Sequence, residues 1–129
     1  MSTRKLEISK WFVAAALAGN LMAANADILS GIMYGGSTQS YVVCYLYNAG
    51  TGSVSVTANS IYNEGSGLLP LLNSCIGSLA SGSTCPVIAN TPTSGANACR
   101  VVLAPSGADM RGEMEIRSSS SILGRIELR

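Results

Sequence analysis

The chain has 129 residues and a net charge of +1, from eight Lys and Arg against seven Asp and Glu, and it contains no histidine. Without histidine, the sequence offers neither a Ser–His nor a Cys–His catalytic pair. Only 12% of the residues are charged, so we expect no basic stripe of the kind that binds a phosphate backbone.

The N-terminal segment has the three parts of a secretory signal peptide. Basic residues precede an apolar run from Trp11 to Ala23, and Ala24-Asn25-Ala26 then supplies the small-x-small triplet that a signal peptidase accepts. A membrane-spanning helix needs about 20 apolar residues, whereas this run is shorter and is interrupted by Asn20. We therefore predict a cleaved signal peptide over residues 1–26 and export to the periplasm or the medium, without a stable membrane anchor.

The predicted mature domain covers residues 27–129 and is long enough for one modest core. It keeps five arginines and six acidic residues, a net charge of −1, and has no lysine. This balance argues against nucleic acid as a partner. Tyrosine is its only aromatic residue, since the tryptophan and the phenylalanine fall within the signal peptide.

Cysteine usage agrees with export. An even number of cysteines in an exported chain predicts disulfides, and the four present are Cys44, Cys75, Cys85 and Cys99. Four cysteines allow three pairings. A zinc site is the competing interpretation, but the chain has no histidine and no Cys-x-x-Cys pair.

From Asp27 onward, short apolar alternations are separated by turn residues about every 8–12 positions, which is typical of an all-β sandwich or barrel. The clearest alternations lie at 41–47, 54–58, 85–89, 99–103, 113–117 and 125–129. No sustained helical period follows the signal peptide, so we expect very little helix. The predicted fold is an all-β, Ig-like β-sandwich of about seven strands, preceded by a signal-peptide helix.

Two of these segments have distinctive patterns. In the strand from Tyr41 to Tyr47, even-numbered apolar residues lie on one face, and the other face carries Tyr41, Val43, Tyr45 and Tyr47. The apolar stretch Leu68–Leu72 contains Pro70, which excludes it from the centre of a sheet.

Three segments together resemble the bacterial Ig-like repeats called choice-of-anchor D, which are related to the abnormal-spindle/Hydin domains. They are the turn Asn48-Ala-Gly-Thr-Gly, the loop Cys75…Leu79-Ala-Ser-Gly-Ser-Thr-Cys85-Pro-Val, and the final strand Arg111-Gly-Glu-Met-Glu-Ile-Arg-Ser. The likeness covers roughly residues 41 to 129. It implies a non-catalytic interaction module with an Ig-like fold.

The resemblance also implies a disulfide between Cys75 and Cys85, and it leaves Cys44 and Cys99 as the second pair. The residue pattern favours the same choice. Cys44 and Cys99 each lie in the middle of an apolar strand face, whereas Cys75 and Cys85 enclose a local loop.

We expect no catalysis, no metal and no cofactor. Apart from the missing histidine, the mature domain has no lysine for a Ser–Lys pair. Glu113 and Glu115 share a strand face and could be considered as a glycosidase pair, but opposite-charge pairs with Arg125, Glu127 and Arg129 across a hairpin explain them better. Calcium at Asp27 or Asp109 is disfavoured, because no run of alternating acidic ligands is present.

The remaining functional signal is the tyrosine face. Tyr41, Tyr45 and Tyr47 combine a flat apolar ring with a polar tip, a residue type enriched at interfaces. We expect them to contact a protein or, alternatively, a glycan, unless the rings only cover the second side of a central strand. The C-terminal strand is a second candidate if it lies at a sheet edge.

These signals favour an exported binding or structural module of a cell-envelope or surface assembly. The alternative is a fimbrial or filament subunit that polymerises by strand exchange. Residues 27–40 fit the donor strand of such a subunit only weakly, because paired glycines interrupt their apolar alternation.

Overall fold

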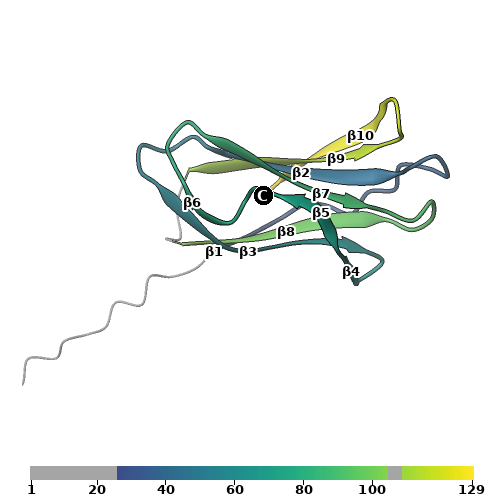
Figure 1. Ribbon diagram of the computed structural model, residues 1–129, viewed down its shortest axis with the longest axis horizontal. Helices are drawn as coiled ribbons and strands as arrows, with labels where there is room; N and C mark the ends of the chain where they lie inside the picture. The colour runs from purple at the N-terminus through teal and green to yellow at the C-terminus, as the bar shows by residue number, and fades with distance from the viewer. Residues whose placement is uncertain (1–25, 105–108) are drawn as a thin grey trace, which may run out of the picture.

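The molecule is built from β-strands packed in two layers (Figure 1). The computed structural model describes residues 26–104 and 109–129, and this part of the chain forms ten strands and no helix. The predicted signal peptide lies outside the described residues, except for Ala26. The ten strands and the lack of helix in the described residues confirm the all-β class.

Both layers are antiparallel sheets. The first, sheet A, has the order β1-β8-β3-β4, with β6 also paired to β3; its strands are β1 (Ala26–Leu29), β3 (Val54–Asn63), β4 (Ser66–Leu68), β6 (Gly77–Leu79) and β8 (Asn97–Ala104). The second, sheet B, has the order β10-β9-β2-β7-β5; its strands are β2 (Tyr41–Asn48), β5 (Pro70–Asn73), β7 (Thr84–Asn90), β9 (Met110–Arg117) and β10 (Ile122–Leu128).

The count of about seven strands was too low, because β1, β4 and β6 were not foreseen; the stretch Leu68–Leu72, predicted only to avoid the centre of a sheet, overlaps the edge strand β5. Strands β4 and β6 have only three residues each, too few to show an alternation. Strand β1 begins at Ala26, within the segment assigned to the signal peptide, and Ala26 pairs with Leu103. The other predicted strands are present.

The core lies between the two sheets and follows the predicted alternation. Residues pointing inward from alternate strand positions are fully or almost fully buried, among them Val42, Leu46, Val56, Ile61, Val87, Val101, Leu103, Met114 and Ile116. In β3 a bulge between Val56 and Ala58 shifts the register. Ala58, expected to point inward, is therefore exposed, and Ile61 takes the next core position.

Two disulfides are present, in the pairing that was expected, and the described residues contain no free cysteine. Cys44 on β2 and Cys99 on β8 join the centres of the two sheets, with their Cα atoms 6.3 Å apart. Cys75 and Cys85 close a short loop that contains β6, and their Cα atoms are 5.2 Å apart. Two disulfides indicate an oxidising environment.

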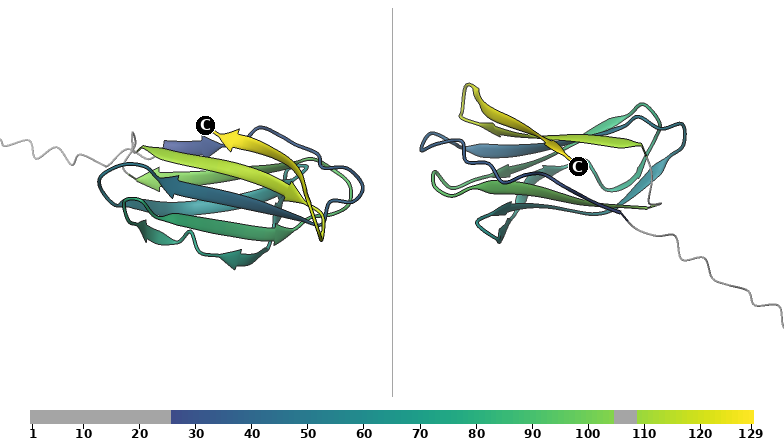
Figure 2. Two further views of the ribbon diagram at one scale, coloured as in Figure 1. Left: turned by 90° about the horizontal axis from the view of Figure 1, so that it is seen from above. Right: turned by 180° about the vertical axis from the view of Figure 1, so that it is seen from behind.

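The segment from Ala26 to Gly35 closes one side of the sandwich, which we call the N-terminal side. β1 pairs with β8 of sheet A, and Leu29 then exchanges two backbone hydrogen bonds of 2.9 Å with Arg129, beyond the end of β10 in sheet B. Further along, Met33 and Asn97 exchange two more, of 3.0 and 2.7 Å. β1 and β10 lie next to each other near the C-terminus, as the left view of Figure 2 shows.

The opposite side is closed by residues 66–79, which we call the leucine side. Here the chain crosses from β4 in sheet A to β5 in sheet B through Leu69. Asn59 of β3 and Asn73 of β5 donate amide hydrogen bonds to each other, at 3.0 and 2.9 Å, and Asn59 also donates to the Cys75 carbonyl at 2.6 Å. These contacts tie the two sheets together at this side.

Charged residues are concentrated on the N-terminal side and on sheet B next to it. From Ile28 to Cys99 the only charged residue is Glu64. Asp27 and Arg100 form an ion pair of 2.8 Å between β1 and β8, and this hydrogen bond and the carboxylate charge raise the pKa of Arg100. The remaining charges of the described chain lie on or beside β9 and β10.

Candidate interaction surface

The three predicted contact tyrosines lie on the outer face of sheet B, on its central strand. Tyr41, Tyr45 and Tyr47 alternate with core residues along β2, and the outward-pointing Val43 between them is only 1% exposed. Side chains of the neighbouring strands β7 and β9, such as Ile88 and Glu115 in register with Val43, therefore cover much of this face. The expectation of one shared face is correct, but the three rings do not form one site.

Tyr41 has a contact of its own, with Arg117. The guanidinium carbon of Arg117 lies 5.8 Å from the centre of its ring, within the range of a cation–π interaction. Arg117 faces Tyr41 directly in the pairing of β2 with β9. Tyr41 is thus committed to a contact within the chain.

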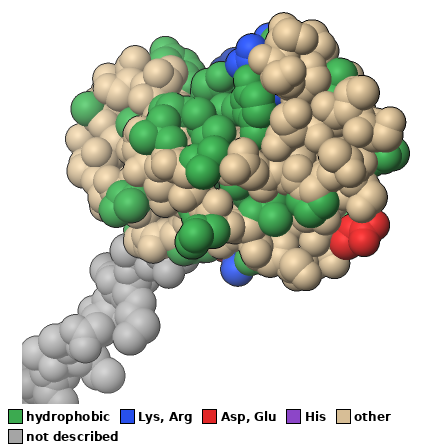
Figure 3. Space-filling view, turned by 45° about the vertical axis from the view of Figure 1, so that its right-hand side comes forward, with side chains coloured by type: hydrophobic (Ala, Val, Ile, Leu, Met, Phe, Trp, Pro, Cys, Tyr) green, Lys and Arg blue, Asp and Glu red, His purple; other side chains and the backbone are tan. Residues whose placement is uncertain are grey.

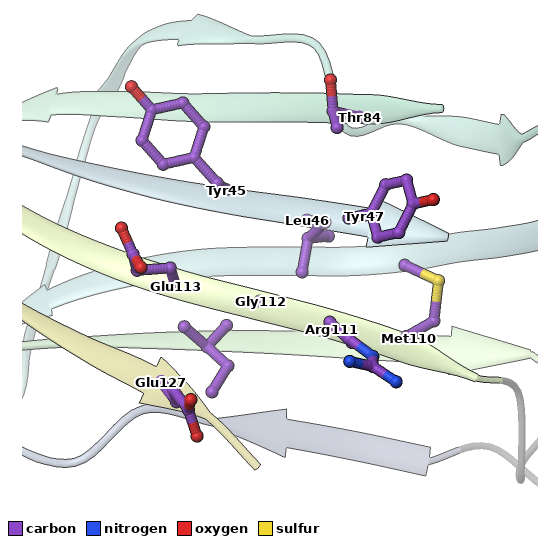
Figure 4. A pocket seen from close by; sticks show the side chains of 10 residues that line it. Tyr45, Leu46, Tyr47, Thr84, Met110, Arg111, Gly112, Glu113 and Glu127 are labelled. Carbon is purple, nitrogen blue, oxygen red and sulfur yellow. The ribbon is translucent and has the colours of Figure 1, made fainter. Parts of the chain in front are cut away.

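Tyr45 and Tyr47 line a shallow groove of about 470 Å³. Figure 4 shows their rings on one side of the groove together with Thr84, and Arg111, Glu113 and Glu127 on the side of β9 and β10. Leu46 points the opposite way, into the core. The groove thus offers two aromatic faces opposite charged hydrogen-bonding groups, the combination that marks energetic centres of interfaces.

The charges across the β9–β10 hairpin are not all paired as expected. Glu115 faces Arg125, an opposite-charge pair of the expected kind, but Glu113 faces Glu127 directly. Two like charges in register disfavour the pairing of the strands. Each carboxylate has an arginine neighbour instead: Arg125 lies 3.3 Å from Glu113, and Arg129 lies 3.6 Å from Glu127.

Glu115 is the buried ionic centre of this face. Its side chain is only 5% exposed, and its carboxylate lies 2.8 Å from Arg125 and 3.7 Å from Arg117. A buried carboxylate needs such partners, because its desolvation is costly. Glu115 is therefore paired with arginines of both β9 and β10, and it shares Arg125 with Glu113.

The C-terminal strand, the second predicted contact region, lies at the edge of sheet B. Part of this edge is covered, because Leu29 and Ser30 pair with Arg129 and Leu128. Gly31 and Gly35 allow the N-terminal segment to approach closely. A Cβ atom on Gly31 would lie 2.5 Å from Ile126 Cδ1, and one on Gly35 would lie 2.5 Å from Ile116 Cγ2.

Some important residues were missed by the sequence reasoning. Asn48 is completely buried and its amide donates hydrogen bonds to the carbonyls of Gly52 and Leu79. Gln39 is 1% exposed and its amide donates to three carbonyls of the loop before β8, those of Pro92, Ser94 and Gly95. Nothing in the local pattern distinguishes these amides from exposed turn residues.

Within residues 26–104 and 109–129, no three or more His, Cys, Asp or Glu side chains cluster as metal ligands would. The same residues contain no helix that is long and apolar enough to span a bilayer. Comparisons of the chain with protein-family models, with curated proteins and with solved structures found no match.

Proposed function

We propose that the chain is an exported, non-catalytic Ig-like module that binds a protein partner within a cell-envelope or surface assembly. The proposed site of action is the periplasm or the cell exterior, and the proposed relationship is to the choice-of-anchor D domains. The two disulfides support an oxidising compartment. The absence of histidine and of lysine after Lys10 supports a role without proton-transfer chemistry.

The groove beside Tyr45 and Tyr47 is the observation that carries this proposal. Tyr47 is 42% exposed, and a half-exposed tyrosine next to Arg111 provides two of the residue types most enriched at binding hot spots. The mixture of aromatic and charged groups suits a polar protein surface. A glycan is the other class of ligand that these groups could contact.

The proposal is tested by site-specific photo-crosslinking in cells that export the protein. A photoreactive amino acid at Thr84, which is exposed and lines the groove, should give one discrete protein adduct, identified by mass spectrometry. Tyr47→Ala and Arg111→Ala should each weaken binding of that partner by about tenfold or more, because both side chains project from the surface.

Tyr34 provides the matched control, since it is also exposed and lies outside the groove. The photoreactive group at Tyr34 should not capture the same partner. Absence of a protein adduct at Thr84, or binding of a glycan alone by the groove, would count against the proposal.

Strand exchange between subunits is the second candidate function, and the N-terminal segment is the observation that favours it. Residues 26–35 fill the space between β8 and β10 as a peripheral strand, the position that a neighbouring chain's segment would take in a filament. Size-exclusion chromatography of the oxidised protein distinguishes the two. Long polymers support exchange, and discrete small species exclude it.

A further inference from the structure

The leucine side exposes an unusual amount of apolar surface. Leu69, Leu71 and Ile76 are 89%, 65% and 73% exposed, and Leu72 beside them is 46% exposed. All four lie within eight consecutive positions, on or next to the edge strand β5. Figure 3 shows that hydrophobic side chains are exposed at several places on one face of the molecule. Large exposed apolar patches mark interaction sites, and four exposed apolar residues close together in the chain make this side a candidate.

The edge strand β5 is short and carries Pro70 and a register shift, which hinder backbone pairing, but it has no charged residue. Natural edge strands commonly carry lysine or other charged residues that prevent association. No charged residue occurs from Gly65 to Cys99, a stretch that contains β4, β5, β6 and β7. Binding at β5 would therefore bury no charge from this stretch, and the nearest charged residue before it in the chain is Glu64, in the turn before β4.

We propose that the leucine side is a self-association surface, at which two copies of this chain pack their β5 edges against each other around a two-fold axis. In a two-fold interface the same patch occurs on both partners, so the patch must complement itself. A neutral, apolar patch meets this condition. The charged strands β9 and β10 lie at the other edge of sheet B, so the pairing brings no like charges together.

The contact is expected to be made by side chains and not by a continuous backbone ladder. Pro70 has no N–H to donate, and the register of β5 shifts between Pro70 and Leu72. Both features interrupt regular strand addition while leaving Leu69 and Leu71 exposed. A small, leucine-based interface of this type gives a weak, reversible dimer.

Sedimentation velocity of the oxidised protein over the micromolar to millimolar range tests this inference. We expect a concentration-dependent shift from one chain to two. The exposed leucines do not support the core, so Leu69→Asp with Leu71→Asp should leave the fold intact. This double variant should weaken the dimer by about tenfold per leucine. Circular dichroism and the unfolding temperature verify folding.

Ile32→Asp is the matched control, because Ile32 is an equally exposed apolar residue, 77% accessible, on the segment that closes the N-terminal side. It introduces the same charge and should leave dimerisation unchanged. A wild-type protein that stays monomeric, or a double variant that associates as strongly as wild type, overturns the inference. Binding of phosphatidylcholine vesicles by wild type and not by the double variant would do so as well, since it would assign the patch to lipid.

Discussion

The two sides of the sandwich are closed in different ways. On the N-terminal side, one segment forms hydrogen bonds with both sheets, glycines allow close packing against Ile126 and Ile116, and Asp27 pairs with Arg100. On the leucine side, the chain crosses from sheet A to sheet B through Leu69 and returns to sheet A between β5 and β6. A disulfide and an amide pair hold these crossings in place.

This difference shows two solutions to the problem of an open sandwich edge. The N-terminal side uses backbone pairing and charge, which satisfies polar groups and discourages association. The leucine side uses local covalent and side-chain links, and it leaves apolar residues facing outward. The first solution covers the open edge with backbone hydrogen bonds, whereas the second leaves apolar side chains exposed.

Removing either disulfide should cause the largest losses in unfolding free energy. Comparing the two variants contrasts the centre of the fold with the leucine side. Cys44 and Cys99 are 55 residues apart, and Cys75 and Cys85 only 10. From chain entropy, replacing the long-range pair with alanine should lower the free energy of unfolding by about 4 kcal/mol, and replacing the local pair by about 2.5–3 kcal/mol. Urea unfolding monitored by circular dichroism measures both. An equal or reversed ranking would contradict this assignment of roles.

A pair of glycine substitutions compares the packing of the two sides directly. In Gly35→Ala, the new Cβ would lie 2.5 Å from Ile116 Cγ2, and Ile116 is fully buried and cannot move away. We expect a loss of about 1–3 kcal/mol in unfolding free energy. In Gly67→Ala, on the leucine side, no atom lies within 4 Å of the new Cβ. That change should stay within about 0.5 kcal/mol, and similar losses in the two variants would show that the sides are packed alike.

The smallest expected losses in stability come from removing charged residues near the N-terminal side. Arg125→Ala removes the closest partner of the buried Glu115 and should cost about 1 kcal/mol or somewhat more. Arg129→Ala removes an exposed ion pair with Glu127 and should cost about 0–1 kcal/mol. Thermal unfolding of the two variants side by side gives the ranking. If Arg129→Ala were the more damaging change, Glu115 would not be the ionic centre of this face.

Much of the fold could be predicted from the sequence, because its main strands are long and alternate regularly. The strand from Tyr41, the strand containing Cys99 and the final hairpin each bury the face that the pattern indicates. The pattern could not predict β4 and β6, which are too short to alternate and form only because β3 offers them a partner. The exposure of Ala58 depends on a bulge, which no local pattern reveals.

The candidate site was predicted only in part. The alternation places Tyr45 and Tyr47 on one outer face, but it cannot show that Tyr41 is engaged by Arg117. The juxtaposition of Glu113 with Glu127 is set by the register of the hairpin, which shifts between Ile122 and Gly124 and which the alternation alone does not specify. The leucines of the crossing were visible in the sequence, but their exposure depends on β5 being at the edge of its sheet.

The N-terminal segment also constrains the order in which the molecule can fold. Asp27 contacts Arg100 across 73 residues of chain, and Ser30 contacts Cys99 across 69. Contacts between such distant positions form slowly, because the loop between them must first be closed at an entropic cost. We therefore expect the first strand to dock on β8 late in folding, so that the N-terminal side is among the last parts to close.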